Sequence, residues 1–405
     1  MNKILLTIVL CFAIQYLIAQ EQEVTFKTDT LTLNGTLAVP AGNGPFPAIV
    51  LVHGSGPNSR DESIALTDAN SACLFPGLYG DTVKTFADLS AAFVAEGYIV
   101  LRYDKRTLTH AASLNLKDIT INDFIRDVHS ALDFLRSHPM ADNQRLILMG
   151  HSQGGNMINI VANERDDVAA LVGLAAPSMA IDSAVAGQIR HIYTACGDSN
   201  FGKAQAAQLL AIFTQLRNGT WNMNTPIMGA YPAFWLDWIH KSDSSVAYYR
   251  TADVPALFIQ GTDDYNVTPE NAYRFQQQLG ASADVYILPG INHFLTDSTH
   301  PEVAKEVSDT ILYWLRNSPL STIEKKRVRL QVLYDTVEGK IILRIPEGKD
   351  VQHLSVETLN GKSVNAEFQK TDGGYILSPQ ALKKGLYVVR GNIDGQPFAQ
   401  KMLVQ

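Results

Sequence analysis

The sequence predicts an α/β protein, with helices on both faces of a mostly parallel sheet and a helical cap, followed by a separate all-β sandwich. Three patterns lead to this prediction. Apolar strand-like runs alternate with amphipathic helical segments up to residue 317, which is typical of a parallel sheet. This alternation is interrupted once, at 179–253. From residue 318 the chain consists of short alternating runs separated by turn residues.

The strands and helices of the larger part follow from apolar periodicity. Continuous apolar runs indicate buried strands, and apolar residues three or four positions apart indicate helices. Asn34-Gly35 is a strong turn signal within the first, β-rich stretch. Strands are expected at 24–30, 31–39, 46–53, 98–103, 145–150, 168–176, 255–261 and 285–289. Helices are expected at 84–96, 122–138, 153–164, 270–279 and 301–316.

Residues 179–253 combine short helix-like patterns with clustered aromatic side chains. We interpret this stretch as a helical insertion that lies over the sheet as a cap. Its aromatic residues either line a substrate pocket or fill the core of the insertion. For substrate binding the prediction names Tyr79, Trp235 and Trp238.

The C-terminal stretch differs from the rest in both periodicity and charge. Residues 318–405 hold 13 basic and 9 acidic side chains, whereas residues 20–317 hold 19 basic and 31 acidic ones. A domain boundary is therefore expected near 317–325. Strands of the sandwich are expected at 328–333, 340–345, 354–358, 363–368, 374–377, 386–390 and 398–404.

Charge and cysteine content exclude several classes of protein. The formal net charge is −7, which disfavours wrapping of nucleic acid through phosphate contacts. Three cysteines are too few for a disulfide scaffold or for the commoner zinc clusters. The chemistry that the motifs predict implies no metal and no organic cofactor.

The first residues have the features of a secretory signal peptide. Lys3 supplies a short positive region, 4–14 is apolar, and cleavage is expected near Ala19, so residues 1–19 are removed. The protein is then secreted, either to the extracellular space or outer-membrane surface or to the periplasm. Cys73 and Cys196 remain after cleavage, and the sequence leaves open whether they pair.

Residues 150–154 read Gly-His-Ser-Gln-Gly and fit the G-x-S-x-G pattern. An apolar strand precedes them and a helix follows, which is the context of a sharp turn that exposes a nucleophilic serine. Ser152 is therefore the predicted nucleophile. The backbone N–H of Gln153, directly after it, is the predicted first donor to an oxyanion.

A serine hydroxyl needs a base, and the base needs an orienting carboxylate. In this architecture they follow the serine in the order acid then histidine, each after a later strand. His293 is the predicted base, and Asp264 the acid, with Asp263 as the alternative. His53–Pro57, after an early strand, is expected to give the second oxyanion donor, from Ser55 or else Gly54.

Six motifs in order resemble secreted α/β-hydrolases of the dienelactone-hydrolase-like and prolyl-oligopeptidase-like carboxylesterase groups over residues 23–317; they are 53–57, 60–62, 101–106, 150–154, 261–267 and 292–294. The resemblance implies the α/β-hydrolase fold and a Ser152, Asp264 and His293 triad, and its G-x-x-D-x-x-V spacing favours Asp264. It implies that residues 102–106 support the active-site loop, although Lys105 fits a solvated charge cluster equally well. Two departures are Ser152 in place of a cysteine nucleophile and the long segment 61–83.

The C-terminal stretch resembles the sorting domain of bacterial type IX secretion at 354–362, 384–389 and 400–404, although the usual Pro-Asn-Pro-like opening is missing. This resemblance implies export, followed by cleavage of the domain or attachment to the cell surface. The competing interpretation is an accessory β-sandwich that binds carbohydrate or stiffens the enzyme.

Together these observations predict a secreted serine carboxylesterase that acts on a small-molecule ester through an acyl-enzyme. A serine aminopeptidase or prolyl-type peptidase of the same fold is the first alternative. A non-catalytic surface-binding protein is the second, and the oligomeric state is left open.

Overall fold

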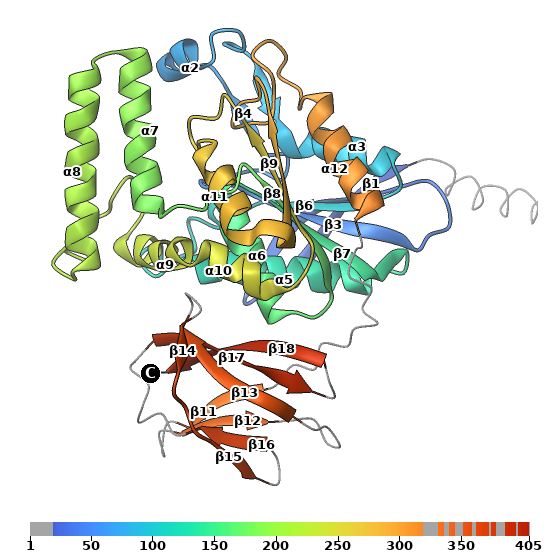
Figure 1. Ribbon diagram of the computed structural model, residues 1–405. Helices are drawn as coiled ribbons and strands as arrows, with labels where there is room; N and C mark the ends of the chain where they lie inside the picture. The colour runs from blue at the N-terminus through green and yellow to red at the C-terminus, as the bar shows by residue number, and fades with distance from the viewer. Residues whose placement is uncertain are drawn as a thin grey trace, which may run out of the picture. The chain divides into compact units, whose positions relative to one another are not determined.

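The computed structural model describes residues 19–318, 331–335, 340–344, 351–358, 362–371, 374–377, 385–393 and 396–404. The chain divides into two compact units, Met1–Thr322 and Ile323–Gln405 (Figure 1). This division falls within the stretch where the change of pattern places a domain boundary. The predicted signal peptide, except for Ala19, lies outside the described residues.

An eight-stranded sheet forms the centre of the first unit. Its strands are β1 (Gln20–Thr28), β2 (Leu31–Val39), β3 (Phe46–Val52), β6 (Ile99–Tyr103), β7 (Ala141–His151), β8 (Val168–Leu174), β9 (Ala256–Gly261) and β10 (Ala283–Leu288). They are arranged in the order β1-β2-β6-β3-β7-β8-β9-β10. All neighbours are parallel except β1-β2 and β2-β6. The predicted fold class, a mostly parallel α/β sheet, is therefore confirmed.

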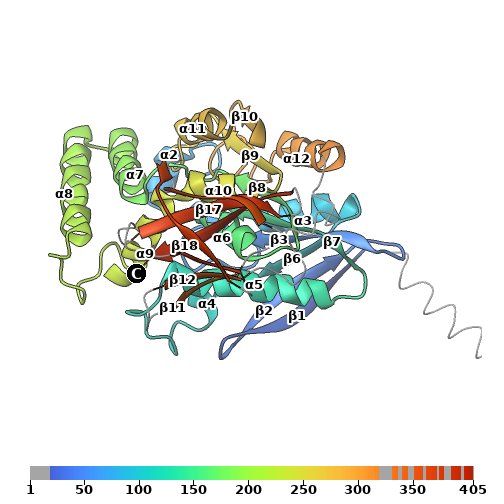
Figure 2. The same ribbon diagram turned by 60° about the horizontal axis from the view of Figure 1, so that its bottom comes forward.

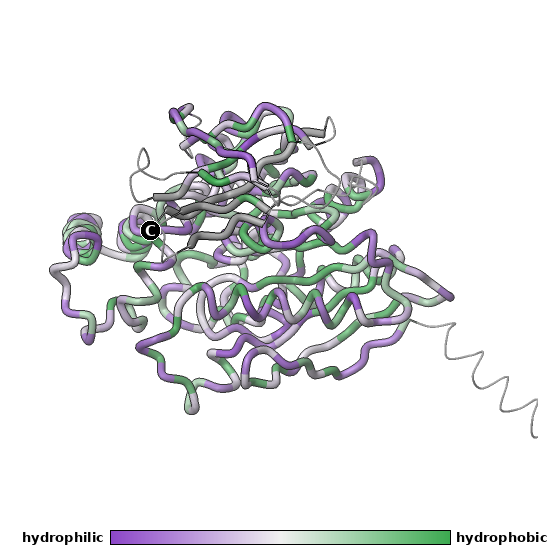
Figure 3. The backbone as a smooth tube through the Cα atoms, turned by 90° about the horizontal axis from the view of Figure 1, so that it is seen from below, coloured by the Kyte–Doolittle hydropathy of each residue, from purple (hydrophilic) through white to green (hydrophobic). Residues whose placement is uncertain are grey.

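Two groups of helices cover opposite faces of this sheet. Helices α3 (Thr85–Ala95) and α12 (Lys305–Asn317) bury their apolar sides in one core (Figure 2). Helices α5 (Ile121–Ser137), α6 (Gly155–Glu164) and α11 (Glu270–Leu279) contribute to the other. Hydrophilic and hydrophobic residues alternate in short stretches along the backbone (Figure 3), as expected of elements that bury one side. Within the described residues, no helix is both long enough and apolar enough to cross a lipid bilayer.

The expected strands and helices of this unit are present, with some ends displaced by a few residues. The strand expected at 145–150 begins at Ala141, and the last helix begins at Lys305. The strand expected at 31–39 is β2, and the turn signal Asn34-Gly35 lies inside it without forming a turn. The chain instead reverses just after Asp29, which has a φ of 51°. Gly35 is needed for close packing, since a Cβ there would lie 2.8 Å from the carbonyl oxygen of Arg102.

Four helices follow β8, where the helical cap was expected. They are α7 (Ile181–Cys196), α8 (Ser199–Arg217), α9 (Pro232–Asp243) and α10 (Ser245–Ala252). Helices α7 and α8 lie side by side at the edge of the unit (Figure 1). The segment 61–83, which is longer than the family resemblance leads one to expect, forms β4 (Ser63–Ala65), α2 (Ala69–Leu74) and β5 (Thr82–Lys84). A short helix, α4 (Arg106–Thr109), follows β6.

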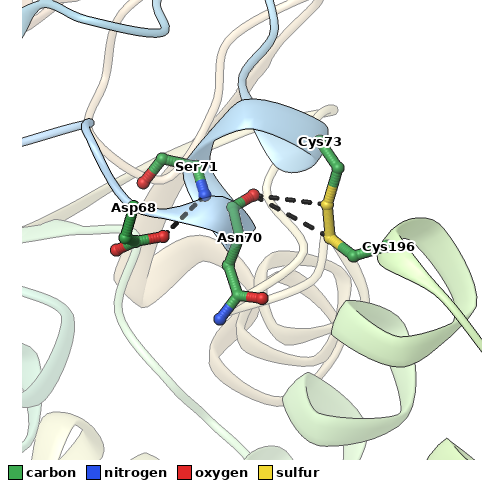
Figure 4. The surroundings of a disulfide bond; sticks show 5 residues. All are labelled: Asp68, Asn70, Ser71, Cys73 and Cys196. Atoms are coloured by element: carbon green, nitrogen blue, oxygen red, sulfur yellow. Dashed lines mark hydrogen bonds between the residues drawn. A yellow bond between two sulfur atoms is a disulfide. The ribbon is translucent and has the colours of Figure 1, made fainter.

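A disulfide joins the cap to the segment 61–83. Cys73 on α2 and Cys196 at the end of α7 are bonded, with their Cα atoms 5.5 Å apart (Figure 4). Asp68 caps α2 by accepting a 2.8 Å hydrogen bond from the Ser71 N–H. The pairing that the sequence left open is thus present in the structure.

The described part of the second unit is all β. One antiparallel sheet has the order β11 (Gln331–Asp335), β12 (Lys340–Arg344), β16 (Gly374–Leu377), β15 (Phe368–Thr371). The other has the order β14 (Ser363–Val364), β13 (Val351–Thr358), β17 (Gly385–Ile393), β18 (Gln396–Val404). Leu343 and Leu377 from the first sheet share a core with Val356, Tyr387 and Val389 from the second, as in a sandwich.

The disulfide predicts a measurable stability effect. Replacing both cysteines (Cys73→Ser with Cys196→Ser) should lower the free energy of unfolding by about 2–4 kcal/mol, because a cross-link between distant residues restricts the unfolded chain. Urea unfolding without reductant measures this difference. Wild-type protein with a reducing agent should match the double variant. A variant as stable as the oxidised wild type would contradict the prediction.

Candidate active site

The G-x-S-x-G residues form a tight turn between β7 and α6. Strand β7 ends at His151, and Ser152 starts the short 3₁₀ helix η1 (Ser152–Gly154) that leads into α6. Ser152 has a φ of 50°, a left-handed conformation that is unfavourable for a residue with a side chain. A Cβ on Gly154 would lie 2.1 Å from the carbonyl oxygen of Val52. Gly154 is therefore needed for this turn, which we call the elbow (Gly150–Gly154), to pack against β3.

Asp264 and His293 lie in the loops after β9 and β10 and contact each other. The His293 Nδ1 is 2.9 Å from the Asp264 Oδ2, and both side chains are buried. The other carboxylate oxygen accepts the N–H groups of Asn266 and Val267 at 2.9 and 2.8 Å. Asp263 is exposed and bonds the Thr262 hydroxyl instead. The structure thus brings Asp264, and not Asp263, to the histidine.

A second contact ties the His293 loop to the elbow. The His151 Nε2 is 2.8 Å from the His293 carbonyl oxygen, and the two rings lie 4.8 Å apart between centroids. Because His151 directly precedes Ser152, this contact places the two loops side by side. With Nδ1 directed at Asp264, Nε2 is the nitrogen of His293 that remains for the serine.

The loop after β3 packs directly against the serine. A Cβ on Gly54 would lie 3.3 Å from the Ser152 Cβ. The Gly54 N–H donates a 2.7 Å hydrogen bond to the buried Glu62 Oε1, so the choice of Gly54 as an oxyanion donor is wrong. Ser55 is exposed, and within the described residues its N–H donates to no protein acceptor. Gln153 lies in the first helical turn, where N–H groups have no intrahelical acceptor.

Glu62 and His151 form a buried ion pair behind this loop, with 3.0 Å between Oε2 and Nδ1. Burial alone would raise the pKa of Glu62 and lower that of His151. The attraction between the two groups outweighs burial, so the pKa of Glu62 is lowered and that of His151 is raised. The pairing therefore favours the charged form of both groups.

Salt bridges fix the loop that contains Glu62. Arg60 Nη2 is 2.7 Å from Asp104 Oδ2, and Arg102 pairs with Asp61. These contacts connect the loop to the end of β6. They agree with the implied supporting role of residues 102–106.

Of the three predicted substrate-binding residues, two are buried in the structure and one is exposed. Trp235 and Trp238 are 5% and 4% exposed, and their indole N–H groups bond the Ile227 carbonyl at 2.8 Å and the Asn156 Oδ1 at 3.1 Å. They fill the core of the cap, so their assignment to substrate binding is wrong. Tyr79 is 53% exposed and its hydroxyl donates to the Thr67 carbonyl.

Sequence reasoning missed an aromatic group beside the acid loop. His191 of α7 stacks on Tyr265 with centroids 4.6 Å apart, and Phe75 packs against both Tyr265 and Phe294. Gln188 of α7 also donates to the Asn266 carbonyl at 2.8 Å. Tyr265 and Phe294 directly follow Asp264 and His293 in the sequence, which could have indicated aromatic residues at the site. The residues that pack against them, His191 and Phe75, come from distant segments of the chain. Within the described residues, no cluster of three or more His, Cys, Asp or Glu side chains is placed to bind a metal ion.

Comparison with known proteins adds a family and relatives. The family model of serine aminopeptidase, S33, matches residues 70–298, more than half of the 405-residue chain. This range contains Ser152, Asp264 and His293 and excludes the loop around Gly54. Esterase EstD of Thermotoga maritima is 28% identical over 307 residues, which cover 72% of this chain and 68% of the esterase.

Solved structures are similar at lower identity. Acylaminoacyl peptidase from Pyrococcus horikoshii has a TM-score of 0.49 and 17% identity, covering 75% of this chain and 42% of the peptidase. This chain therefore spans less than half the length of that peptidase. Est1E from Butyrivibrio proteoclasticus has a TM-score of 0.48 and 15% identity, covering 73% of this chain and 97% of Est1E.

The buried His53 predicts a pH dependence of stability. Burial lowers the pKa of His53 from 6.5 to about 4, with Glu62 opposing the shift and Lys105 adding to it. Between these two values the unfolded chain protonates His53 and the folded protein does not. The free energy of unfolding should therefore fall as pH falls, by about 2 kcal/mol from pH 7 to pH 5.

Urea unfolding of the wild type and of a His53→Phe variant at both pH values tests this prediction. The variant should lose less stability than the wild type on acidification, whatever its stability at pH 7. Equal losses in the two proteins would contradict it.

Proposed function

Because this chain belongs to the serine aminopeptidase S33 family of α/β-hydrolases, we propose that it is a serine hydrolase that cleaves carboxylic esters. Ser152 is the nucleophile, His293 the base and Asp264 the orienting acid. The observation that supports this most is the hydrogen bond of 2.9 Å between His293 and Asp264, in loops tied to the left-handed Ser152.

The proposed reaction follows from this geometry. The Ser152 hydroxyl attacks the ester carbonyl while the His293 Nε2 takes its proton, and Asp264 stabilises the resulting imidazolium. His293 then gives the proton to the leaving alcohol. Water, activated by the same histidine, attacks the acyl-serine and releases the acid. The N–H groups of Ser55 and Gln153 stabilise the oxyanion in both steps.

An ester is the preferred substrate for two reasons. Esterase EstD is similar over 72% of this chain. An aminopeptidase also needs a free carboxylate to bind the substrate ammonium group, whereas the two buried carboxylates that contact the loops around Ser152, namely Glu62 and Asp264, are each paired with a histidine. A carboxylesterase of the dienelactone-hydrolase-like or prolyl-oligopeptidase-like kind is our finer assignment. A serine aminopeptidase, which the family description favours, is the second candidate.

We also propose that the protein is exported. The signal-like residues 1–19 support this, and so does the Cys73–Cys196 disulfide, because disulfides form in oxidising compartments. The second unit would then act in type IX sorting or as an accessory module. Fractionation of cells expressing the full chain, with mass measurement of the exported protein, tests both points. A full-length protein retained in the cytoplasm would argue against export.

Removal of the nucleophile is the first functional test. Ser152→Ala should lower kcat/KM for short-chain p-nitrophenyl esters by about 10⁴-fold or more, because no other group forms the acyl-enzyme. The circular dichroism spectrum should be unchanged. Undiminished turnover would rule out the mechanism. Wild-type protein that cleaves aminoacyl or prolyl amides but no esters would favour the peptidase.

The neighbouring aspartates provide a matched pair of variants. Asp264→Asn should lower kcat by about 10³–10⁴-fold, because the amide no longer stabilises the imidazolium. Asp263→Asn should leave kcat within about twofold, since Asp263 is exposed and bonded to Thr262. Steady-state kinetics on one ester substrate measures both. Equal losses in the two variants would contradict the assignment.

A further inference from the structure

Lys105 is buried behind the proposed oxyanion loop, and not in a solvated cluster. It follows β6 and is 3% exposed. Its Nζ donates to the Gly54 carbonyl oxygen at 2.6 Å and to the Gln153 Oε1 at 2.9 Å. The same ammonium lies 4.7 Å from the centroid of the Phe124 ring. Lys105 thus contacts both segments that supply the proposed oxyanion donors.

The contact with Gly54 fixes the direction of the Ser55 N–H. The Gly54 C=O and the Ser55 N–H belong to one planar peptide group, and in a trans peptide they point in opposite directions. Because Lys105 and the Asn58 amide (3.1 Å) both hold the carbonyl, the N–H must face away from them. A cation on the carbonyl also polarises the peptide and strengthens its N–H as a donor.

Glu62 and Lys105, which have opposite charges, contact the residues directly before and after Ser152. Glu62 joins the Gly54 N–H to His151, the residue before Ser152. Lys105 joins the Gly54 carbonyl to the side chain of Gln153, the residue after Ser152. Both polar groups of Gly54 are therefore held by buried side chains that also contact the residues directly before and after Ser152. Burial lowers the pKa of Lys105 to about 7, while Glu62 and Asp127 oppose this shift.

We propose that Lys105 is a positioning residue for the oxyanion hole, whose ammonium holds the Gly54–Ser55 peptide and Gln153 so that both N–H donors face one point before substrate binds. The inference rests on the proposed serine-hydrolase function. It predicts an effect on the transition state and not on substrate binding.

The test compares Lys105→Met with Lys305→Met, a change of an 84% exposed side chain on α12. For hydrolysis of a p-nitrophenyl ester, Lys105→Met should lower kcat about 10–100-fold and leave KM within about twofold, because loss of one oxyanion donor costs about 10²–10³-fold. The inhibition constant of a trifluoromethyl ketone, which forms a tetrahedral adduct, should rise by a similar factor. Lys305→Met should match the wild type in all three quantities.

Separate outcomes decide the two proposals. Wild-type protein without Ser152-dependent ester hydrolysis would overturn the proposed function. An active wild type together with a folded Lys105→Met variant of unchanged kcat, or with a raised KM alone, would overturn the role of Lys105.

A second variant decides the question if Lys105→Met does not fold. Gln153→Met removes one acceptor of Lys105 and keeps the backbone donor, so kcat should fall about 3–10-fold at constant KM. An unchanged kcat would overturn the proposal. If Lys105→Met does fold, the double variant Lys105→Met with Gln153→Met should have the same kcat as Lys105→Met alone, because the Gln153 side chain acts through Lys105. A kcat loss in the double variant equal to the product of the two single losses would overturn the proposal.

Discussion

The left-handed backbone of Ser152 is the constraint on which the rest of the site depends. A residue with a side chain at a φ of 50° is unfavourable, so the surrounding structure must hold it. Close packing of Gly154 on the end of β3 does this. The parallel pairing of Val52 with Gly150 also places the loop after β3 beside the elbow. The same edge of the sheet gathers the loops after β9 and β10, which contain Asp264 and His293.

Buried charge then fixes how these loops face each other. Three charged contacts surround the elbow, from Asp264 to His293, from Glu62 to His151 and from Lys105 to Gly54 and Gln153. Asp264 is hydrogen-bonded to His293 and Lys105 to Gly54 and Gln153, and Glu62 accepts the Gly54 N–H, which offsets the cost of removing these charges from water. Salt bridges from Arg60 and Arg102 anchor the loop with Glu62 from outside.

Helix α7 connects the cap to the segments around these charged contacts. The disulfide joins α7 to α2, and the stacking of His191 on Tyr265 joins the same helix to the loop of Asp264. Trp238 has another role, since its indole N–H donates to Asn156 and so ties the cap to α6. Cap stability and the geometry of the acid loop are therefore linked through one helix.

The sequence by itself determined the α/β class, the elbow at Ser152 and the serine, acid, histidine order, because these depend on local periodicity and on motifs next to predicted strands. The tertiary structure decided what each side chain contacts. In the folded protein Trp238 and Lys105 are buried. The Gly54 N–H donates to Glu62, and Cys73 is bonded to Cys196. Burial and pairing depend on residues far away in the chain, and a pattern of neighbours in sequence does not contain that information.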